Sequence, residues 1–248
     1  MQSFTAVTYN VLAQAHVRPH RYPLCHPQAL DPVRRRALLL TKIDELNADL
    51  LCLQEVEPDL HQDLCERLEP THHTAYAQRP GRPDGYAVFA RRDLFGWKRP
   101  EVIDVALIAH LTMNGEPLHV ACTHLKWQDE SVPPARHVGY HQMLELIKHR
   151  DRTGGTWIFA GDFNATSQSF VITAALDNGM AESCRNQRPW DTVAINGRTR
   201  KLDYLLFSEG QFVPIPGRLP KLFRDTVLPS LTEPSDHLPV TVKLVPSS

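Results

Sequence analysis

Short β-rich segments outnumber helical ones in this chain, and this imbalance limits its fold more than any other feature. Apolar and β-branched residues concentrate in short runs that turn-forming residues interrupt, a pattern that predicts strands. The expected strands are residues 4–10, 49–54, 74–78, 86–91, 101–112, 117–123, 156–160, 202–207 and 238–244. Helical spacing of apolar residues predicts helices at 31–47, 59–68, 134–150 and 168–178. These counts exclude a barrel made of eight strand–helix units.

The turn between two of the expected strands fixes part of the strand pairing. Asn114-Gly115 lies between two apolar runs, and Asn-Gly in that setting is a strong signal for a β-hairpin. At least part of the sheet is therefore antiparallel. Prolines gather at 80–83, 133–134 and 214–220, where we expect loops. Two packed sheets with helices outside fit these elements, and the lack of repeats and linkers favours a single domain over 1–248.

Composition indicates a globular protein of a reducing compartment. Of the 248 residues, 42% are hydrophobic and 22% are charged, as in ordinary folded proteins. The sequence has no run of 18 apolar residues and opens without a signal-peptide pattern, so we expect no membrane segment. The five cysteines include no Cys-x-x-Cys pair and do not indicate a disulfide framework. The expected location is the cytoplasm.

Charge and histidine spacing argue against two simple binding roles. The net charge is −1, from 27 basic and 28 acidic residues, which disfavours a protein that holds nucleic acid by bulk charge alone. An enzyme that contacts a few phosphates remains compatible with this balance. The 13 histidines are scattered, and the sequence shows no Cys/His spacing of a zinc finger.

Polar residues gather at the ends of the apolar strands. Sheet enzymes build their sites at strand ends and in the loops that follow, so we expect these side chains to converge. Taken singly, a carboxylate after a strand is usually a turn former or a helix cap. Ten such residues at strand ends together indicate a shared functional site. Its members are Asn10, Gln54, Glu55, Thr123, His124, Asp162, Asn164, Asp203, Asp236 and His237.

The donor atoms of this set predict phosphoryl chemistry. Carboxylate and carboxamide oxygens dominate over imidazole and thiolate, which favours Mg²⁺, with Mn²⁺ as a substitute, over Zn²⁺. A metal of this kind offsets phosphate charge, a carboxylate orients a water, and a histidine stabilises the transition state or the leaving oxygen. The residues therefore predict an enzyme that acts on phosphate esters.

The ordered motifs resemble the endonuclease/exonuclease/phosphatase superfamily, and the resemblance runs from Thr8 to Pro239. Each motif alone is weak, but six of them in the right order are specific. The resemblance implies an α+β fold, a four-layer αββα sandwich of two mixed, mostly antiparallel sheets with helices outside. It also implies a Mg²⁺-dependent phosphodiesterase in which an activated water attacks in line.

The resemblance further implies five catalytic residues. Asp162 would orient or deprotonate the attacking water, and Asn164 would bond the nucleophile or the phosphate. His237 would contact the scissile phosphate while Asp203 fixes its tautomer. His124 would be the second histidine on the phosphate.

Four further positions complete the expected site. The resemblance implies that Glu55 is the principal metal ligand, with Asn10 beside it and Asp236 as a further metal-site carboxylate. Asp84 stands where the family often has an acid near His124, and its expected role is to orient that ring. A simple turn residue is the alternative for Asp84.

Three segments resemble the deadenylase, nocturnin and Angel branch of the superfamily. They are Tyr9–Gln14, the stretch from Tyr22 to Arg36, and Thr123–Trp127. The expected reaction is hydrolysis of phosphodiester bonds at RNA 3′ ends, by a 3′ exoribonuclease or by processing of 2′,3′-cyclic phosphates. The alternatives are an abasic-site DNA endonuclease, which residues 200–205 resemble, a small-molecule or lipid phosphatase, and an inactive scaffold of the same fold.

Four residues are candidates for contacts with the substrate. Trp127, Phe163 and Trp190 would stack on a terminal base, and Arg34 would contact phosphate. Packing in the core, or a place on the solvated face of the first helix, is the alternative for each. The expected partner is an RNA 3′ end, with no membrane and no leucine-rich docking domain, and the expected state is a monomer.

Overall fold

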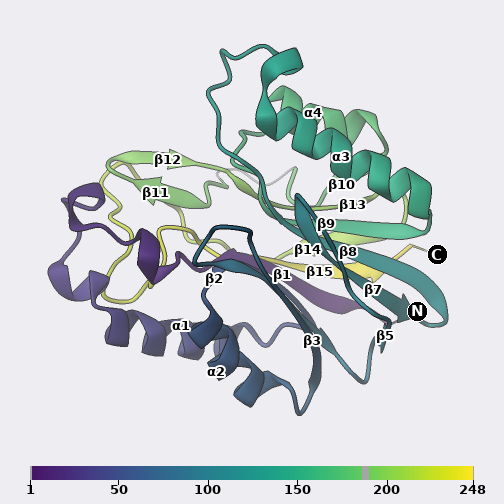
Figure 1. Cartoon of the computed structure of the whole chain (residues 1–248), viewed down its shortest axis with the longest axis horizontal. Helices are drawn as coiled ribbons and strands as arrows, with labels where there is room; N and C mark the ends of the chain where they lie inside the picture. Colours follow the sequence, from purple (N-terminus) through teal and green to yellow (C-terminus); the bar gives the residue numbers. More distant parts are fainter. Residues whose placement is uncertain (1, 186–189, 248) are drawn as a thin grey trace.

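Two β-sheets pack face to face in the computed structural model, which describes residues 2–185 and 190–247. Two helices cover the outer side of each sheet (Figure 1). They are α1 Pro32–Leu46 and α2 Pro58–Leu68 on one side, and α3 Val138–Thr153 and α4 Phe170–Asp177 on the other. The predicted αββα sandwich is confirmed.

The first sheet has the strand order β14-β15-β1-β2-β4-β3. Its strands are β1 Phe4–Asn10, β2 Leu50–Val56, β3 His72–Gln78, β4 Gly85–Arg91, β14 Phe212–Pro216 and β15 Val240–Pro246. The ends of the chain enter this sheet side by side, because β1 and β15 pair antiparallel with Phe4 opposite Leu244 (Figure 1).

The second sheet has the order β10-β13-β9-β8-β7-β5, and β6 also pairs with β7. Its strands are β5 Gly96–Trp97, β6 Glu101–Ile103, β7 Ala106–Met113, β8 Glu116–His124, β9 Thr156–Asp162, β10 Met180–Glu182 and β13 Asp203–Ser208. A separate hairpin joins β11 Val193–Ile195 to β12 Arg198–Arg200. Short 3₁₀ turns occupy Gln14–His16, Pro19–Arg21, Pro27–Leu30 and Pro134–Arg136.

Alternation along the central strands explains the four layers. In β2, Leu50 and Cys52 enter the core between the sheets, whereas Leu51 and Leu53 pack under α1 and α2. Successive strand residues point to opposite faces, so a strand that is apolar on both faces must be covered on both. Among the described residues, no helix is long and apolar enough to cross a membrane.

Two parallel strand pairs position the site. β1 runs parallel to β2 in the first sheet, and β8 runs parallel to β9 in the second. The carboxyl ends of each pair lie level, with Asn10 opposite Gln54 and His124 opposite Asp162. β13 is antiparallel to β9, and its first residue Asp203 pairs with Asp162. The sheets touch through β1 and β9, so the two polar strand ends meet.

Three expected elements differ from the structure by more than two residues. Residues 101–112 form β6 and β7, which turn back on one another at Asp104-Val105, because the polar Asp104 interrupts the apolar run. The helix expected at 134–150 begins at Val138, where the His137 side chain caps the N–H of Tyr140. The loop expected at 214–220 begins as β14, an edge strand in which Pro214 breaks no central ladder.

Replacing Leu53 with Ala should lower the free energy of unfolding by about 2–5 kcal/mol. Leu53 belongs to β2, and its side chain is fully buried under α1 and α2. Urea denaturation of the purified variant measures this loss. Leu24→Ala removes the same atoms from a side chain that is 63% exposed and should change the value by less than about 0.5 kcal/mol. Equal losses in the two variants would contradict the assigned core.

Candidate active site

The polar strand ends surround one cleft with a volume of about 1250 Å³. Asn10, Glu55, His124 and Asp162 lie at the carboxyl ends of their strands, and Asp203 opens β13. The loop before β15 supplies Asp236 and His237. The cleft is lined by Glu55, His124, Asp162, Asn164, Asp236 and His237, among others.

Glu55 reaches the cleft through a β-bulge. The register between β2 and β4 shifts at Gln54/Val56, and Glu55 has a φ of 59°. This left-handed conformation is uncommon for a residue with a side chain and indicates local strain. Bulges re-aim side chains next to sites. Here the bulge brings the Glu55 carboxylate to the N–H of Ala13, which donates to Oε2 over 3.0 Å.

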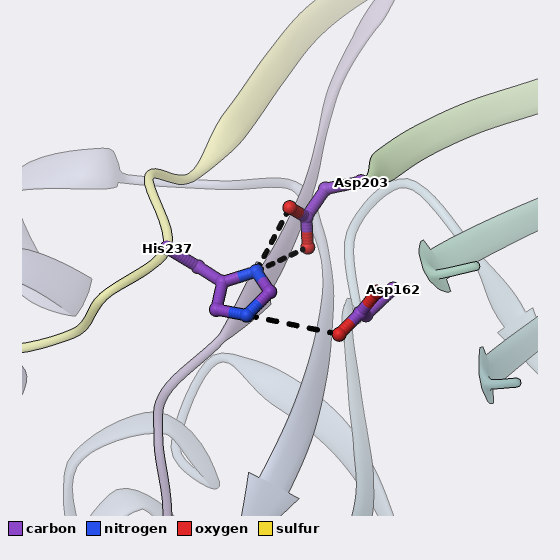
Figure 2. A group of neighbouring side chains, drawn as sticks. All are labelled: Asp162, Asp203 and His237. Atoms are coloured by element: carbon purple, nitrogen blue, oxygen red, sulfur yellow. Dashed lines mark hydrogen bonds and ion pairs between the residues drawn. The ribbon is translucent and has the colours of Figure 1, made fainter. Parts of the chain in front are cut away.

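Asp203 fixes the orientation of the His237 ring (Figure 2). Nδ1 of His237 lies 2.9 Å from Oδ2 and 3.2 Å from Oδ1 of Asp203. Oγ1 of Thr192 also donates to Asp203, over 2.5 Å. With Nδ1 held in this way, Nε2 of His237 faces Asp162, 3.7 Å from its Oδ2.

The surroundings of His237 favour its charged form. Burial lowers the pKa of His237, but the carboxylates of Asp203 and Asp162 outweigh that effect and raise the pKa well above its usual value. Nδ1–H then donates to Asp203, and Nε2–H points towards Asp162. A cation fixed at the floor of a cleft is suited to stabilise negative charge on a bound group.

Asn10 links the carboxylates of the two sheets. Its Nδ2 donates to Oε1 of Glu55 over 3.1 Å and to Oδ2 of Asp162 over 3.2 Å. Its Oδ1 accepts from the N–H of Leu12. One buried amide therefore holds the ends of β1, β2 and β9 in register with one another.

His124 lies between the same two carboxylates. Its Nε2 is 3.4 Å from Oδ2 of Asp162, and its Nδ1 is 3.9 Å from Oε1 of Glu55. Burial, aided by the charge of Arg79, lowers the pKa of His124 to about 3. The ring is neutral at pH 7 and differs in charge from His237. Within the described residues, its Nδ1 has no hydrogen-bond partner.

Asn164 positions Asp162. The backbone N–H of Asn164 donates to Oδ1 of Asp162 over 2.8 Å, and its Nδ2 donates to the carbonyl of Leu125 over 2.9 Å. Asn164 has a φ of 49°, a conformation that asparagine tolerates better than most residues. The turn after β9 therefore fixes both Asp162 and the start of the loop after β8.

Asp236 keeps one free oxygen in the cleft. Oη of Tyr22 donates to its Oδ2 over 3.0 Å. Its Oδ1 is buried and has no hydrogen-bond partner among residues 2–185 and 190–247. A buried carboxylate oxygen without a hydrogen-bond donor is unfavourable unless a cation binds it instead.

The carboxylate oxygens of the cleft fit a hard divalent cation. Burial raises the pKa of both Glu55 and Asp162, and the charge of Asp236 raises that of Glu55 further. A cation would remove these unfavourable charges. Asp162, Asp203 and His237 place three ligand atoms within 4.8 Å of one another, but Asp203 already accepts from His237 and Thr192. Asp162 likewise accepts hydrogen bonds at both oxygens. The remaining candidate ligands are oxygens of Glu55 and Asp236, with Asn10 beside them, a donor set that suits Mg²⁺.

Comparison with known families gives the site a context. The sequence profile of the Endonuclease/Exonuclease/phosphatase family matches residues 7–237. The chain belongs to this family. Every polar strand end described above, from Asn10 to His237, falls within the match.

Curated members of the family extend the comparison. The mouse protein 2′,5′-phosphodiesterase 12 is 24% identical over 96% of this chain, but the match covers 51% of that protein. The chain therefore spans about half the length of the first curated relatives that it matches. Protein angel homolog 2 of Danio rerio is 33% identical over 37% of this chain.

Solved structures of the family share the fold. ANGEL2, described as a 2′,3′-cyclic phosphatase, superposes with a TM-score of 0.79 at 21% identity, covering 98% of this chain and 95% of that one. The human nocturnin catalytic domain gives a TM-score of 0.74 at 23% identity, covering 99% and 94%. At these identities the likeness establishes the architecture alone.

Of the four residues expected to contact the substrate, only Trp127 lines the cleft. Phe163 is buried against Tyr204, with ring centroids 5.6 Å apart, and cannot stack on a base. Trp190 is buried in the core between the sheets. Arg34 lies outside the cleft, where it donates to the carbonyl of Leu231. For these three residues the structure agrees with the alternative, packing in the core for Phe163 and Trp190 and a place on the solvated face of α1 for Arg34. The sequence does not show which way an aromatic or a helix residue points.

Asp84 does not orient His124 as expected. Its oxygens bond His16, whose Nε2 lies 2.9 Å away, and Arg79. The hydrogen bond to Asp84 raises the pKa of His16. Asp84 precedes β4 and also accepts from the N–H of Arg79 through its carbonyl. It therefore holds His16 and Arg79 at the cleft wall rather than orienting the His124 ring.

Arg35 is a site residue that the sequence analysis missed. It is only 2% exposed, and it donates to the carbonyls of Val11, Leu12 and Pro234 and to Oε1 of Gln14. Its guanidinium joins the loop after Asn10 to the loop that carries Asp236. The run of three arginines at 34–36 was the available signal, but helix periodicity alone does not reveal which of them is buried.

Replacing Arg35 with Met should lower the free energy of unfolding by roughly 3–5 kcal/mol, because three buried carbonyls lose their donor. Urea denaturation measures the loss. Arg34→Met is the matched control and should cost less than about 0.5 kcal/mol, since Arg34 is exposed. If both variants unfold at the wild-type urea concentration, Arg35 does not hold the two loops together.

Proposed function

We propose that this protein is a metal-dependent phosphodiesterase that hydrolyses phosphodiester bonds at RNA 3′ ends. The observation that carries this proposal is the meeting of the Asp203–His237 pair and Asp162 with Glu55 and Asp236 in one cleft. A histidine cation and a general base on one side, and carboxylate oxygens that can bind a cation on the other, are what hydrolysis of a phosphodiester needs.

Asp162 is the proposed base. Burial raises its pKa, so its carboxylate is a better proton acceptor than an ordinary aspartate. The N–H of Asn164 and the amide of Asn10 fix its two oxygens. Asp162 therefore accepts the proton of a water that attacks the phosphorus, and the orientation of its carboxylate selects where that water lies.

His237 is the proposed contact to the phosphate. Its ring is charged and held by Asp203, so it stabilises the negative charge that builds on the phosphoryl oxygens. Glu55 and Asp236, with Asn10 beside them, would hold the Mg²⁺ ion, and Mn²⁺ would substitute. Bound there, the ion supplies charge neutralisation to the phosphate and the leaving oxygen.

The side chains on the walls of the cleft favour a substrate that carries negative charge and an aromatic base. Lys126, Arg79 and His16 line the walls around the carboxylates, and the exposed indole of Trp127 lies at the same cleft. Cations bind phosphates and an exposed indole offers a face for base stacking. The names of the relatives include a 2′,5′-phosphodiesterase, a 2′,3′-cyclic phosphatase and 3′-5′-exoribonucleases, all of which concern nucleotide phosphoesters.

The proposal is tested with end-labelled substrates and Mg²⁺. These are RNA with a 3′-hydroxyl A-tail, RNA with a 2′,3′-cyclic phosphate, a 2′,5′-linked oligoadenylate, and duplex DNA with an abasic site. Shortening or end conversion of an RNA, lost on addition of EDTA, is the expected result. Cleavage of the DNA alone would replace the proposal with an abasic-site endonuclease. Activity on none of them would overturn it in favour of a small-molecule or lipid phosphate substrate.

The Asp162→Asn variant should lose about 10²- to 10⁴-fold in kcat, because the amide cannot accept the proton of the attacking water. Steady-state kinetics on the preferred RNA measures this loss. Thermal unfolding serves as the control, and Tm should stay the same or rise, since a buried negative charge is removed. A kcat close to that of the wild type would exclude Asp162 as the base.

The Trp127→Ala variant should raise KM for an RNA substrate by a factor equivalent to about 1–3 kcal/mol, the usual contribution of one stacked base, with kcat little changed. Trp127→Tyr keeps an aromatic face and should restore most of the affinity. An unchanged KM in the alanine variant would mean that the exposed indole does not contact the substrate.

A further inference from the structure

A buried carboxylate on the first-sheet side of the cleft takes part in none of the catalytic steps. Asp84 is fully buried, and its two oxygens bond two different side chains. Oδ1 lies 2.9 Å from Nε2 of His16, and Oδ2 accepts from Nη2 of Arg79. His16 and Arg79 both line the cleft, whereas Asp84 does not. The carboxylate therefore lies behind the pair and fixes both side chains at the cleft wall.

Backbone contacts hold the same three residues in place. The N–H of Arg79 donates to the carbonyl of Asp84 over 3.0 Å and closes the turn between β3 and β4. Two N–H groups of the 3₁₀ turn that ends at His16 donate to the Glu57 carboxylate, over 2.9 and 3.1 Å. A fixed pair of side chains loses little freedom when a ligand binds, which favours recognition.

Both side chains keep nitrogen atoms that Asp84 does not use. The contacts to Asp84 occupy Nε2 of His16 and Nη2 of Arg79. Nε of Arg79 is buried and, within the part of the chain that the structure describes, makes no hydrogen bond. A buried donor without an acceptor is unfavourable unless a bound group supplies one. Phosphate, with several charged oxygens, accepts from more than one such donor at once.

The electrostatics of the pair suit an anion. Arg79 carries a permanent charge, and the hydrogen bond to Asp84 is the main cause that raises the pKa of His16. With that ring charged, the three side chains carry a net charge of +1. The pair also acts on the catalytic residues, because the charges of Arg79 and His16 add to the effect of burial that lowers the pKa of His124.

The sheet register places the pair beside the proposed metal ligands. At the start of β4, Gly85 pairs with β2 next to Glu55 and with β3 next to Arg79. The backbones at Glu55 and Arg79 are therefore about two strand spacings apart, roughly 9–10 Å. Because Asp84 ties the guanidinium to its own turn, Arg79 does not extend to Glu55. The pair therefore faces a neighbouring group of the substrate rather than the scissile phosphate.

We propose that His16 and Arg79 bind a second phosphate of the substrate, which adjoins the scissile phosphodiester on its 5′ side. This inference rests on the proposed function, since at an RNA 3′ end a neighbouring phosphate exists on the 5′ side alone. The pair selects nucleotide chains with at least two phosphates over a lone cyclic nucleotide or a dinucleoside monophosphate. Asp84 is a positioning residue, because it contacts the two side chains and not the substrate.

A binding experiment tests this phosphate subsite without turnover. Adenosine 3′,5′-bisphosphate and adenosine 3′-phosphate differ by one phosphate, and neither contains a phosphodiester bond. In calorimetry with Mg²⁺, the bisphosphate should bind the wild type about tenfold more tightly or better, as one charge-assisted hydrogen bond provides. This preference should shrink in Arg79→Gln and in His16→Gln and vanish in the double variant. Equal affinities in the wild type, no binding of the bisphosphate, or a preference that persists in the double variant would overturn the subsite.

Two variants separate the subsite from general effects of charge and folding. Arg92→Gln is the matched control, because Arg92 is exposed, lies outside the cleft and donates to the carbonyl of Glu69. It should keep the preference of the wild type, and a loss equal to that of Arg79→Gln would also overturn the subsite. Arg79→Lys keeps the charge and should restore part of the preference. If Arg79→Gln fails to fold, His16→Gln and Arg79→Lys decide the test.

Kinetics distinguish a failure of the subsite from a failure of the proposed function. The dinucleotides ApA and pApA contain the same scissile bond, and pApA adds one phosphate on the 5′ side. The wild type should cleave pApA with a kcat/KM about tenfold higher, mainly through KM, and the double variant should lose this ratio. Equal kcat/KM values for the two dinucleotides would overturn the subsite. Cleavage of neither, with a bisphosphate preference that depends on His16 and Arg79, would overturn the proposed function and support the subsite.

Discussion

Mutual repulsion among buried carboxylates is the constraint on which the architecture of the cleft depends. Glu55, Asp162, Asp203 and Asp236 crowd together where two strand ends meet. Each is held by a group that its own strand could not provide. Asn10 bridges two of them, His237 faces a third, and Tyr22 donates to the fourth. The fold supplies enough fixed donors to bring these charges together, and the remaining excess is what a metal ion would neutralise.

The strained backbone of the cleft follows from the same constraint. Leu12, Glu55 and Asn164 all have a positive φ, and each lies at or beside a strand end that carries a site residue. Such conformations cost free energy and persist where the surroundings dictate them. The backbone bends at these points so that side chains from two separate sheets can face one another across a single cleft.

The sequence predicted the layers and the polar strand ends because both leave local signals. Short apolar runs marked β1, β2 and β9, and a carboxylate or amide at the end of each marked the cleft. It could not predict partners that arise from tertiary contacts. Arg35 is one of three consecutive arginines and nothing local marks it as the buried one, and Asp84 looked like a partner of His124. Phe163 stands between two site residues, yet its ring packs in the apolar cluster under α3 and α4.

The sequence analysis also did not predict the very short strands and one edge strand, because these strands too depend on tertiary contacts. β5, β10, β11 and β12 are two or three residues long, too short for a periodic pattern to appear. β14 contains two prolines, which normally indicate a loop, and is tolerated because it forms the edge of its sheet. In these places the strand exists because a neighbour offers hydrogen bonds, and the local sequence contributes little.

The pairing of β1 with β15 has a practical consequence. Phe4 faces Leu244 at one end of the sheet, and Asn10 enters the cleft at the other. Both described termini therefore emerge together, on the side of the sheet remote from the chemistry (Figure 1). A tag, a fused module or an immobilising surface attached at either terminus would leave the mouth of the cleft facing outward. A short linker could join the termini without crossing the substrate's path, and opening the chain at another loop would then give a circular permutant.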